Sequence, residues 1–253
     1  MSLVLNQLPE QLLIFARIAG LLLLNPIFGR RTIPTMVRMG YVLWLSLFLL
    51  PLVSTNRIVV DDLTFILLLF KEILLGFSFA YVFQLYLLFL HFIGDLLDYQ
   101  FGLSMSKVFD PGSQIQASIT GNLLSWIFIL MFFLSDTHLL WLRFIHSTFD
   151  HLPLDAWLNL TRLAGIMVDL FIVVFASTLR LAIPMLIAAF ILEVAMGILM
   201  RLIPQIHVFV INIQAKILLN IVLLVLLMQP ITHFLDTSWD VVMNQLQYIL
   251  MNI

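Results

Sequence analysis

Two carboxylates that lie three residues apart, Asp95 and Asp98, have a spacing that suits acid–base chemistry. Residues at this spacing share one face of a helix, and paired carboxylates are typical of aspartic proteases. The preceding Phe92-Ile93-Gly94 lacks the first glycine of the GxGD pattern of intramembrane proteases. A catalytic dyad also needs carboxylates from two facing elements. We therefore interpret the pair as a polar helix end near a membrane surface; an active Asp98→Asn variant would exclude the alternative, a protease.

Three charged side chains, Asp169, Arg180 and Glu193, fall within the apolar run Ile166–Met200, which also contains Pro184. A charge at membrane depth is costly and usually faces a protein neighbour or a water-filled path. Asp169 and Arg180 are eleven residues apart, so a helix brings them to nearly one face but too far apart along its axis to pair. We expect each charge to find a partner elsewhere or to line a wet surface; a structural ion pair is the alternative.

A third polar pattern lies near the C-terminus, where Asn212, Lys216 and Asn220 repeat at every fourth position. If this segment is helical, the three side chains form one polar stripe on an apolar helix. Snorkelling of the long side chain explains Lys216 alone, but it does not explain two asparagines in line with it. The stripe indicates a face directed toward a partner helix or a hydrated pore.

Other motifs that carry chemistry are missing from the sequence. His138, His146 and His151 lie near Asp150, but their spacing matches no helical zinc motif. Phosphate-binding glycine loops, the HExxH metalloprotease motif and the GxSxG hydrolase motif are all absent. The sequence therefore predicts no metal site, no cofactor and no enzymatic activity.

The composition defines the class of protein that must position these residues. Of 253 residues, 62% are hydrophobic and 10% charged, and the mean hydropathy is +1.12; a soluble domain has about 25% charged residues. We expect one multi-pass membrane domain, or a subunit buried in a membrane assembly. The net charge of -2 says nothing about nucleic acid, but the sequence has no basic patch, so we expect no nucleic-acid partner. The absence of cysteine excludes disulfides. The N-terminus lacks the basic region of a cleavable signal peptide.

Six apolar blocks without period-two alternation predict an all-α fold. The second block is shorter than the roughly 17–25 residues of a membrane span. The third and fifth are long enough for two abutting helices or one kinked helix, with breaks near Lys71–Glu72 and Pro184. The excess of basic residues in alternate connections predicts that both termini lie outside. The blocks are Leu12–Phe28, Met39–Val53, Leu63–Ile93, Leu123–Leu142, Ile166–Met200 and Ile217–Leu235.

A polar segment, Ser104–Asn122, separates the third and fourth blocks. Its Asp110-Pro111-Gly112 sequence is a turn signal, because proline presets φ and glycine permits a positive φ. The segment suits an ordinary surface connection. It equally suits a re-entrant loop, because irregular backbone at membrane depth is tolerated against protein or water.

Several segments in this order and spacing resemble the FliR family, the export gate subunits of flagellar type III secretion that are related to the injectisome T subunit. The resemblance runs from Arg17 to Asn220. Each motif is weak alone, and their succession makes the match specific. The segments are Ala16–Ile18, Asn25–Gly29 with Ile33-Pro34, Lys71–Phe77, Gly94–Ser104 with Asp110-Pro111, Leu181–Pro184 and Arg201–Phe209.

The resemblance implies a non-enzymatic subunit that assembles with FliP-like and FliQ-like subunits into a conical gate for unfolded flagellar proteins. An FlhB-like switch subunit, and an FlhA-like subunit in addition, would be neighbours. The gate would sit at the bacterial inner membrane in the flagellar basal body, with helices lifted out of the bilayer. The chain would resemble a FliP-like part, about residues 1–178, followed by a FliQ-like hairpin and tail, about residues 179–253.

The resemblance also implies roles for individual residues. Residues 104–122 would be a plug loop in the closed pore, hinged at Gly102 and Gly121. The hairpin tip, with Arg201, Pro204 and Gln205, would face the cytoplasm. The cost of burying charge, and not the resemblance, predicts that Asp169, Arg180, Glu193 and Lys216 are buried charges at subunit contacts. The plug residues would be Met105, Ser106, Lys107, Val108, Phe109, Asp110, Pro111, Gly112, Ser113, Gln114 and Ile115.

Two other functions fit some of the same features. A stand-alone secondary transporter would use Asp169, Arg180 and Glu193 as coupling groups, but such transporters usually show internal repeats, which this sequence lacks. A purely structural scaffold of the basal body would differ from a gate only in not lining the export path.

Overall fold

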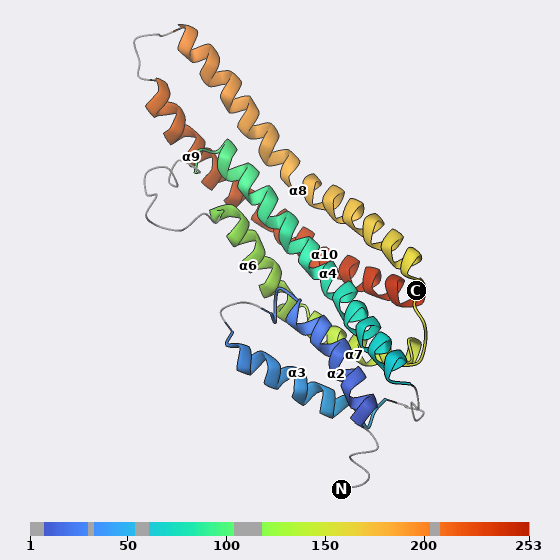
Figure 1. The fold of residues 1–253 in the computed structure, drawn as a ribbon. Helices are drawn as coiled ribbons and strands as arrows, with labels where there is room; N and C mark the ends of the chain where they lie inside the picture. The colour runs from blue at the N-terminus through green and yellow to red at the C-terminus, as the bar shows by residue number, and fades with distance from the viewer. Residues whose placement is uncertain (1–7, 30–32, 54–60, 104–117, 203–207, 253) are drawn as a thin grey trace. The chain divides into compact units, whose positions relative to one another are not determined.

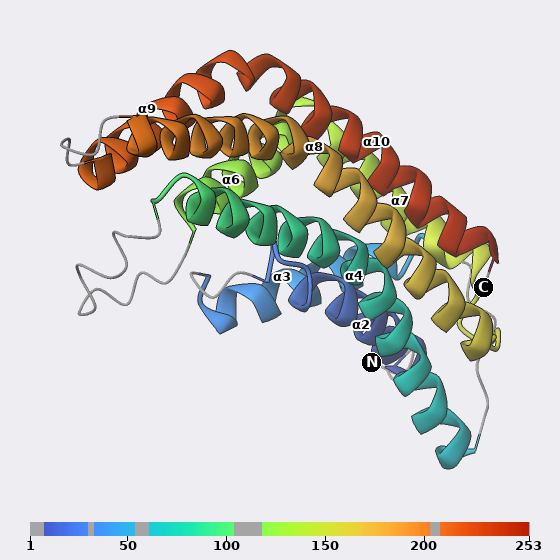
Figure 2. The ribbon, with the colours of Figure 1, turned by 90° about the horizontal axis from the view of Figure 1, so that it is seen from above.

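A computed structural model describes residues 8–29, 33–53, 61–103, 118–202 and 208–252. Within these ranges all regular structure is helical, as Figures 1 and 2 show, which confirms the all-α prediction. The helices are α2 (Leu8–Leu23), α3 (Thr35–Leu49), α4 (Asp62–Gln100), α6 (Ile119–Leu134), α7 (Thr137–His151), α8 (Leu160–Leu202), α9 (Val208–Leu226) and α10 (Met228–Asn252).

The two longest apolar blocks each form one uninterrupted helix. Helix α4 has 39 residues and continues through Lys71–Glu72, and α8 has 43 residues and contains Pro184. One long helix in each block, the second of the two alternatives, is therefore confirmed, and the alternative of two abutting helices that meet near Lys71–Glu72 or Pro184 is wrong. Both helices are long and apolar enough to cross a membrane, and two further broken pairs, α6 with α7 and α9 with α10, add two more spans if each pair is counted as one.

Two other blocks, the fourth and the sixth, are each divided between two helices. The fourth block, Leu123–Leu142, is divided between α6 and α7. Helix α7 begins after Asp136, whose φ of 56° is left-handed; aspartate tolerates this conformation better than most residues. The sixth block, Ile217–Leu235, is divided between α9, which ends at Leu226, and the 25-residue helix α10, which also contains the acidic C-terminal tail.

Two compact units, each discontinuous in sequence, make up the chain. Unit 1 consists of Met1–Leu85, Ser135–Ile172 and Trp239–Ile253. Aromatic rings fill its core: the ring of Phe83 on α4 lies 4.5 Å from that of Trp141 on α7 and 5.7 Å from that of Trp239 on α10, measured between centroids. These rings join three segments that are distant in sequence, because large buried aromatic surfaces dominate such cores.

Unit 2 consists of Tyr86–Leu134 and Val173–Ser238. Its core packs Ile93 and Leu97 of α4 against Ala182 and Met185 of α8, with leucines of α9 at its edge. The part of α8 in this unit and α9 run antiparallel, side by side in both views (Figures 1 and 2). The expected division of the chain into a FliP-like part, about residues 1–178, and a FliQ-like hairpin and tail, about residues 179–253, stays a prediction.

Candidate functional site

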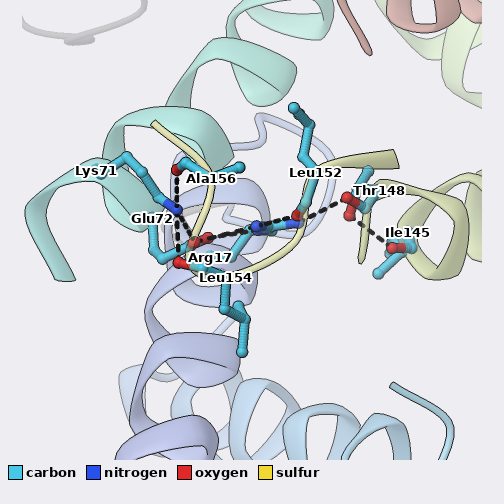
Figure 3. A network of polar contacts seen from close by, with 8 residues as sticks. All are labelled: Arg17, Lys71, Glu72, Ile145, Thr148, Leu152, Leu154 and Ala156. Carbon is cyan, nitrogen blue, oxygen red and sulfur yellow. Dashed lines mark hydrogen bonds and ion pairs between the residues drawn. The ribbon is translucent and has the colours of Figure 1, made fainter. Parts of the chain in front are cut away.

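A cluster of three buried charges, Arg17, Lys71 and Glu72, lies inside unit 1 (Figure 3). Two glycines bring its helices together. A Cβ atom at Gly20 would lie 2.5 Å from the carbonyl oxygen of Ile73, and one at Gly76 would overlap the carbonyl oxygen of Arg17. The α2 and α4 backbones therefore touch where the charged side chains meet. We call these three residues the charged cluster.

The carboxylate of Glu72 is shared by both cations of the charged cluster. Arg17 donates to it from Nε at 2.5 Å and from Nη2 at 3.0 Å, and Lys71 Nζ lies 2.8 Å from Oε1. A two-pronged guanidinium–carboxylate pair is among the stronger charge-assisted interactions. The side chains of Arg17, Glu72 and Lys71 are only 1%, 0% and 7% exposed.

The remaining donors of the two cations bind backbone carbonyls around the α7–α8 connection. Arg17 donates to the carbonyls of Thr148 at 2.7 Å and Leu152 at 2.8 Å, and Lys71 donates to those of Leu154 at 2.8 Å and Ala156 at 2.9 Å. The Arg17 guanidinium also lies 4.3 Å from the ring centroid of Phe149, within cation–π range. Figure 3 shows these contacts converging from both sides of Glu72.

This arrangement makes the charged cluster a clamp. Helix α2, helix α4 and the connection Leu152–Asn159 are held by polar bonds that exist only in the folded chain. Both carboxylate oxygens are engaged, and the cationic donors are directed at oxygen atoms, as buried charges require. These residues lie in segments that resemble the family, but the sequence alone predicts no role for them. The available signal is that opposite charges lie inside two separate apolar blocks.

A second buried carboxylate, Asp98, holds the start of α6 in unit 2. Its Oδ2 accepts from Ser118 Oγ at 2.8 Å and from the Ile119 amide at 2.7 Å. Its Oδ1 accepts from the Thr120 amide at 3.2 Å and from Thr120 Oγ1 at 2.5 Å. Because the first amides of a helix lack intrahelical partners and carry partial positive charge, the carboxylate caps α6 from outside it.

The two helices joined by Asp98 also approach closely. A Cβ atom at Gly94 on α4 would overlap the backbone of Gly121, and one at Gly121 would lie 3.0 Å from the Cα of His91. Gly121, one of the two expected hinges, lies in the first turn of α6, and its hinge role stays a prediction. Gly102, the other, follows α4 with a φ of +76°, which glycine adopts without steric cost.

Asp95 and Asp98 do not form a dyad in this structure. The Asp98 carboxylate is 1% exposed and is saturated by donors from residues 118–120, whereas Asp95 is exposed. One carboxylate is therefore committed to a helix cap, which agrees with the interpretation of a polar helix end over that of a protease.

The three charges of the fifth apolar block have different surroundings. Glu193 on α8 accepts from Lys216 of α9 at 3.1 Å and from Gln100 of α4 at 3.2 Å, all within unit 2. Its side chain is 52% exposed, so this is an internal but open ion pair. Asp169 and Arg180 are exposed and make no hydrogen bond or ion pair with any residue that the structure describes.

The polar stripe lies on helix α9, as expected. Lys216 is half-buried in its pair with Glu193, and Asn220 is 2% exposed. The amide oxygens of Asn212 and Asn220 are buried without a donor among the described residues. An unpaired buried oxygen is costly, but Asn220 is covered by the chain itself, so a stripe that faces a partner helix or a hydrated pore stays a prediction.

The remaining expected residues are placed as follows. Arg201 is exposed at the end of α8, whereas Pro204, Gln205 and the plug residues 105–115 lie outside the described ranges. His146 lies 3.4 Å from Asp150 one turn away on α7. No group of three or more potential metal ligands occurs among the described residues.

The fold and its site define a class: a helical membrane protein whose apolar helices carry internally clamped charges together with unpaired ones. The family model of bacterial export proteins, family 1, matches residues 8–241. The chain belongs to this family.

Relatives extend over nearly the whole chain. It is 26% identical over 234 residues to the flagellar biosynthetic protein FliR of Bacillus subtilis (strain 168), covering 91% of this chain and 90% of that protein. It is 25% identical over 241 residues to FliR of Escherichia coli (strain K12), covering 92% and 90%. It is also 28% identical over 228 residues to the Yop proteins translocation protein T of Yersinia pestis, covering 87% of each.

Proposed function

We propose that this chain is the FliR-type subunit of a hetero-oligomeric type III export gate and helps to form and gate the path for unfolded flagellar proteins. As a member of its family it is a type III export component of the bacterial inner membrane. Its relatives carry both flagellar and translocation names at similar identity, 26% and 28%. The flagellar branch is our proposal, together with a non-enzymatic role in which other subunits supply the energy.

The surface of helix α8 is the structural observation that supports assembly with partners. Only 17% of its most apolar 18-residue window is buried within the chain, against 67% for α4. Lipid alone would cover an apolar surface, but the same helix exposes Asp169 and Arg180, and charges facing lipid at membrane depth are costly. A protein neighbour that supplies counter-charges covers both kinds of side chain.

We propose FliP-like and FliQ-like subunits as these neighbours, with FlhB-like and FlhA-like subunits at the cytoplasmic side near Arg201, Pro204 and Gln205. Purification from membranes through a tag on this chain tests the assembly. We expect one copy of the chain with several copies of two different small membrane proteins, counted by native mass spectrometry. Recovery of the chain alone, or as a homo-oligomer, would contradict the gate and favour the stand-alone transporter.

Two single variants test whether the exposed charges of α8 face the partners. Asp169→Leu and Arg180→Leu remove exposed charges that have no partner among the described residues, so we expect the chain to persist while partner recovery falls. Arg162→Leu is the control, because this exposed arginine donates to Asn252 within unit 1. Equal recovery in all three would show that the unpaired charges do not face the partners.

The plug proposal concerns residues 104–122, hinged at Gly102 and Gly121. Deleting Val108–Ile115 is expected to make cells or proteoliposomes leaky to small ions while export continues, because a steric plug blocks the idle pore without driving transport. The control replaces the same eight residues with a glycine–serine segment of equal length, which keeps the length of the connection and separates the loss of these side chains from the shortening of the loop. Unchanged ion conductance after the deletion would contradict the plug, and crosslinking of a stalled substrate to this segment would separate a gate from a scaffold.

A further inference from the structure

An apolar groove lies on unit 1 between α3 and α7, and none of the three residues of the charged cluster lines it. Its volume is about 440 Å³, within the roughly 300–1,000 Å³ typical of sites for small ligands. Side chains of α3 and Leu52 form one wall, and Leu142, Arg143, Ile145 and His146 of α7 form the other. The groove is thus almost wholly apolar, with two basic side chains on the α7 wall.

The α3 wall is an aromatic stripe. Tyr41, Trp44 and Phe48 follow one helix face, and successive rings stack with centroids 6.3 and 5.7 Å apart and interplanar angles of 17° and 13°. Trp44 and Phe48 are 59% and 57% exposed. Trp and Tyr concentrate where lipid headgroups meet acyl chains, because their rings are apolar and their polar atoms can stay wet.

The α7 wall carries a cation. Arg143 is exposed and makes no ion pair or hydrogen bond with the residues that the structure describes. The neighbouring His146 lies 3.4 Å from Asp150, one turn further on along α7. Arg143 is thus a positive charge without a counter-charge among the described residues, at the wall of an apolar slot.

From this juxtaposition we infer that the groove binds one anionic glycerophospholipid. An acyl chain lies along the aromatic stripe, and the phosphate is held by Arg143. The inference is independent of the proposed export function. The charge favours lipid over a partner helix: an apolar helix seated here would leave Arg143 unpaired, whereas an anionic phospholipid covers the rings and neutralises the guanidinium in one molecule.

Crosslinking in intact membranes tests the occupant before any detergent is added. A photoreactive benzophenone side chain replaces Phe48, and the full chain is expressed with its partners and irradiated in cells. Mass spectrometry of the chain is expected to show an added mass equal to phosphatidylglycerol or another anionic phospholipid. A crosslink to a partner protein, to a second copy, or to residues 54–60 of the same chain would overturn the inference.

A second measurement isolates the headgroup contact. The complex is reconstituted with equal amounts of phosphatidylglycerol and phosphatidylcholine, and the lipid crosslinked at position 48 is identified. Since one basic side chain near anionic lipid is worth about 1 kcal/mol, Arg143→Ala should lower the preference for phosphatidylglycerol about fivefold. Arg143→Lys should retain most of it, and Arg162→Ala, an exposed arginine outside the groove, should leave it unchanged. Equal labelling by both lipids in the unmodified chain would overturn the proposed phosphate contact.

Discussion

Replacement of Glu72 by glutamine is expected to destabilise unit 1 by about 3–5 kcal/mol, because two buried cations then lose their shared anion. Arg17 and Lys71 would keep their carbonyl acceptors but not the carboxylate at 2.5–3.0 Å. Proteins are stable by only about 5–15 kcal/mol, so much of the chain should be degraded before assembly. In the purified complex, a thermal melt should shift by roughly 6–20 °C, at the 2–4 °C per kcal/mol typical of chains of this length.

A control and a double variant separate the charge effect from general damage to α4. Asp62→Asn removes an exposed carboxylate in the first turn of the same helix, where about 1 kcal/mol or less is expected. Arg17→Met combined with Glu72→Met replaces the main pair by apolar side chains and should cost less than the sum of the two single changes. Additive losses, or a Glu72→Gln melt like that of Asp62→Asn, would show that the cluster is not a clamp.

Much of the helical fold was predictable, because long apolar blocks leave few alternatives to helices in a membrane protein. The positions at which these helices are interrupted or continue were not predictable. Lys71–Glu72 resembled an interruption in sequence, but the residues that satisfy their charges come from α2 and the α7–α8 connection, which local patterns do not connect. Pro184 similarly marks no helix end, since it lies inside α8.

The C-terminal helix shows a signal that sequence reasoning passed over. Trp239, Val242, Leu246 and Ile249 of α10 are all buried, and their spacings of three and four residues are those of an amphipathic helix. Overall polarity outweighed this pattern, so the segment was treated as a tail. Periodicity reports a buried face even where mean hydropathy is low.

At the candidate site, the sequence indicated which polar residues are unusual, but not which groups form hydrogen bonds or ion pairs with them. Glu193 and Lys216 are 23 residues apart, and their pairing depends on the antiparallel packing of α8 and α9. The sequence predicts a polar helix end at Asp98, but the donors that bind its carboxylate lie beyond residues 104–117. Contacts between residues so far apart in sequence are set by tertiary packing, and local patterns in a single sequence do not predict them.

Substitution of Asp98 by asparagine is expected to loosen the start of α6 by about 2–4 kcal/mol, because charge-assisted hydrogen bonds and a helix cap are lost together. One amide oxygen can still accept, but the new NH₂ group would face two donors. Hydrogen exchange measured by mass spectrometry should therefore rise in residues 118–123 and stay unchanged around the charged cluster. Thr120→Val removes one opposing donor, so it should cost less in the asparagine background than in the unmodified chain.

Because Asp98 caps α6, loss of function in the Asp98→Asn variant no longer indicates a protease. Loss of the helix cap alone would explain the same result. Asp95→Asn becomes the informative partner: an aspartyl dyad requires both carboxylates, whereas the exposed Asp95 contributes nothing to the cap. We expect Asp95→Asn to support normal export, and Asp98→Asn to leak ions as the Val108–Ile115 deletion does, since Asp98 anchors the chain immediately after that segment. Equal loss of export in both variants, with unchanged exchange at residues 118–123, would favour the dyad over the cap.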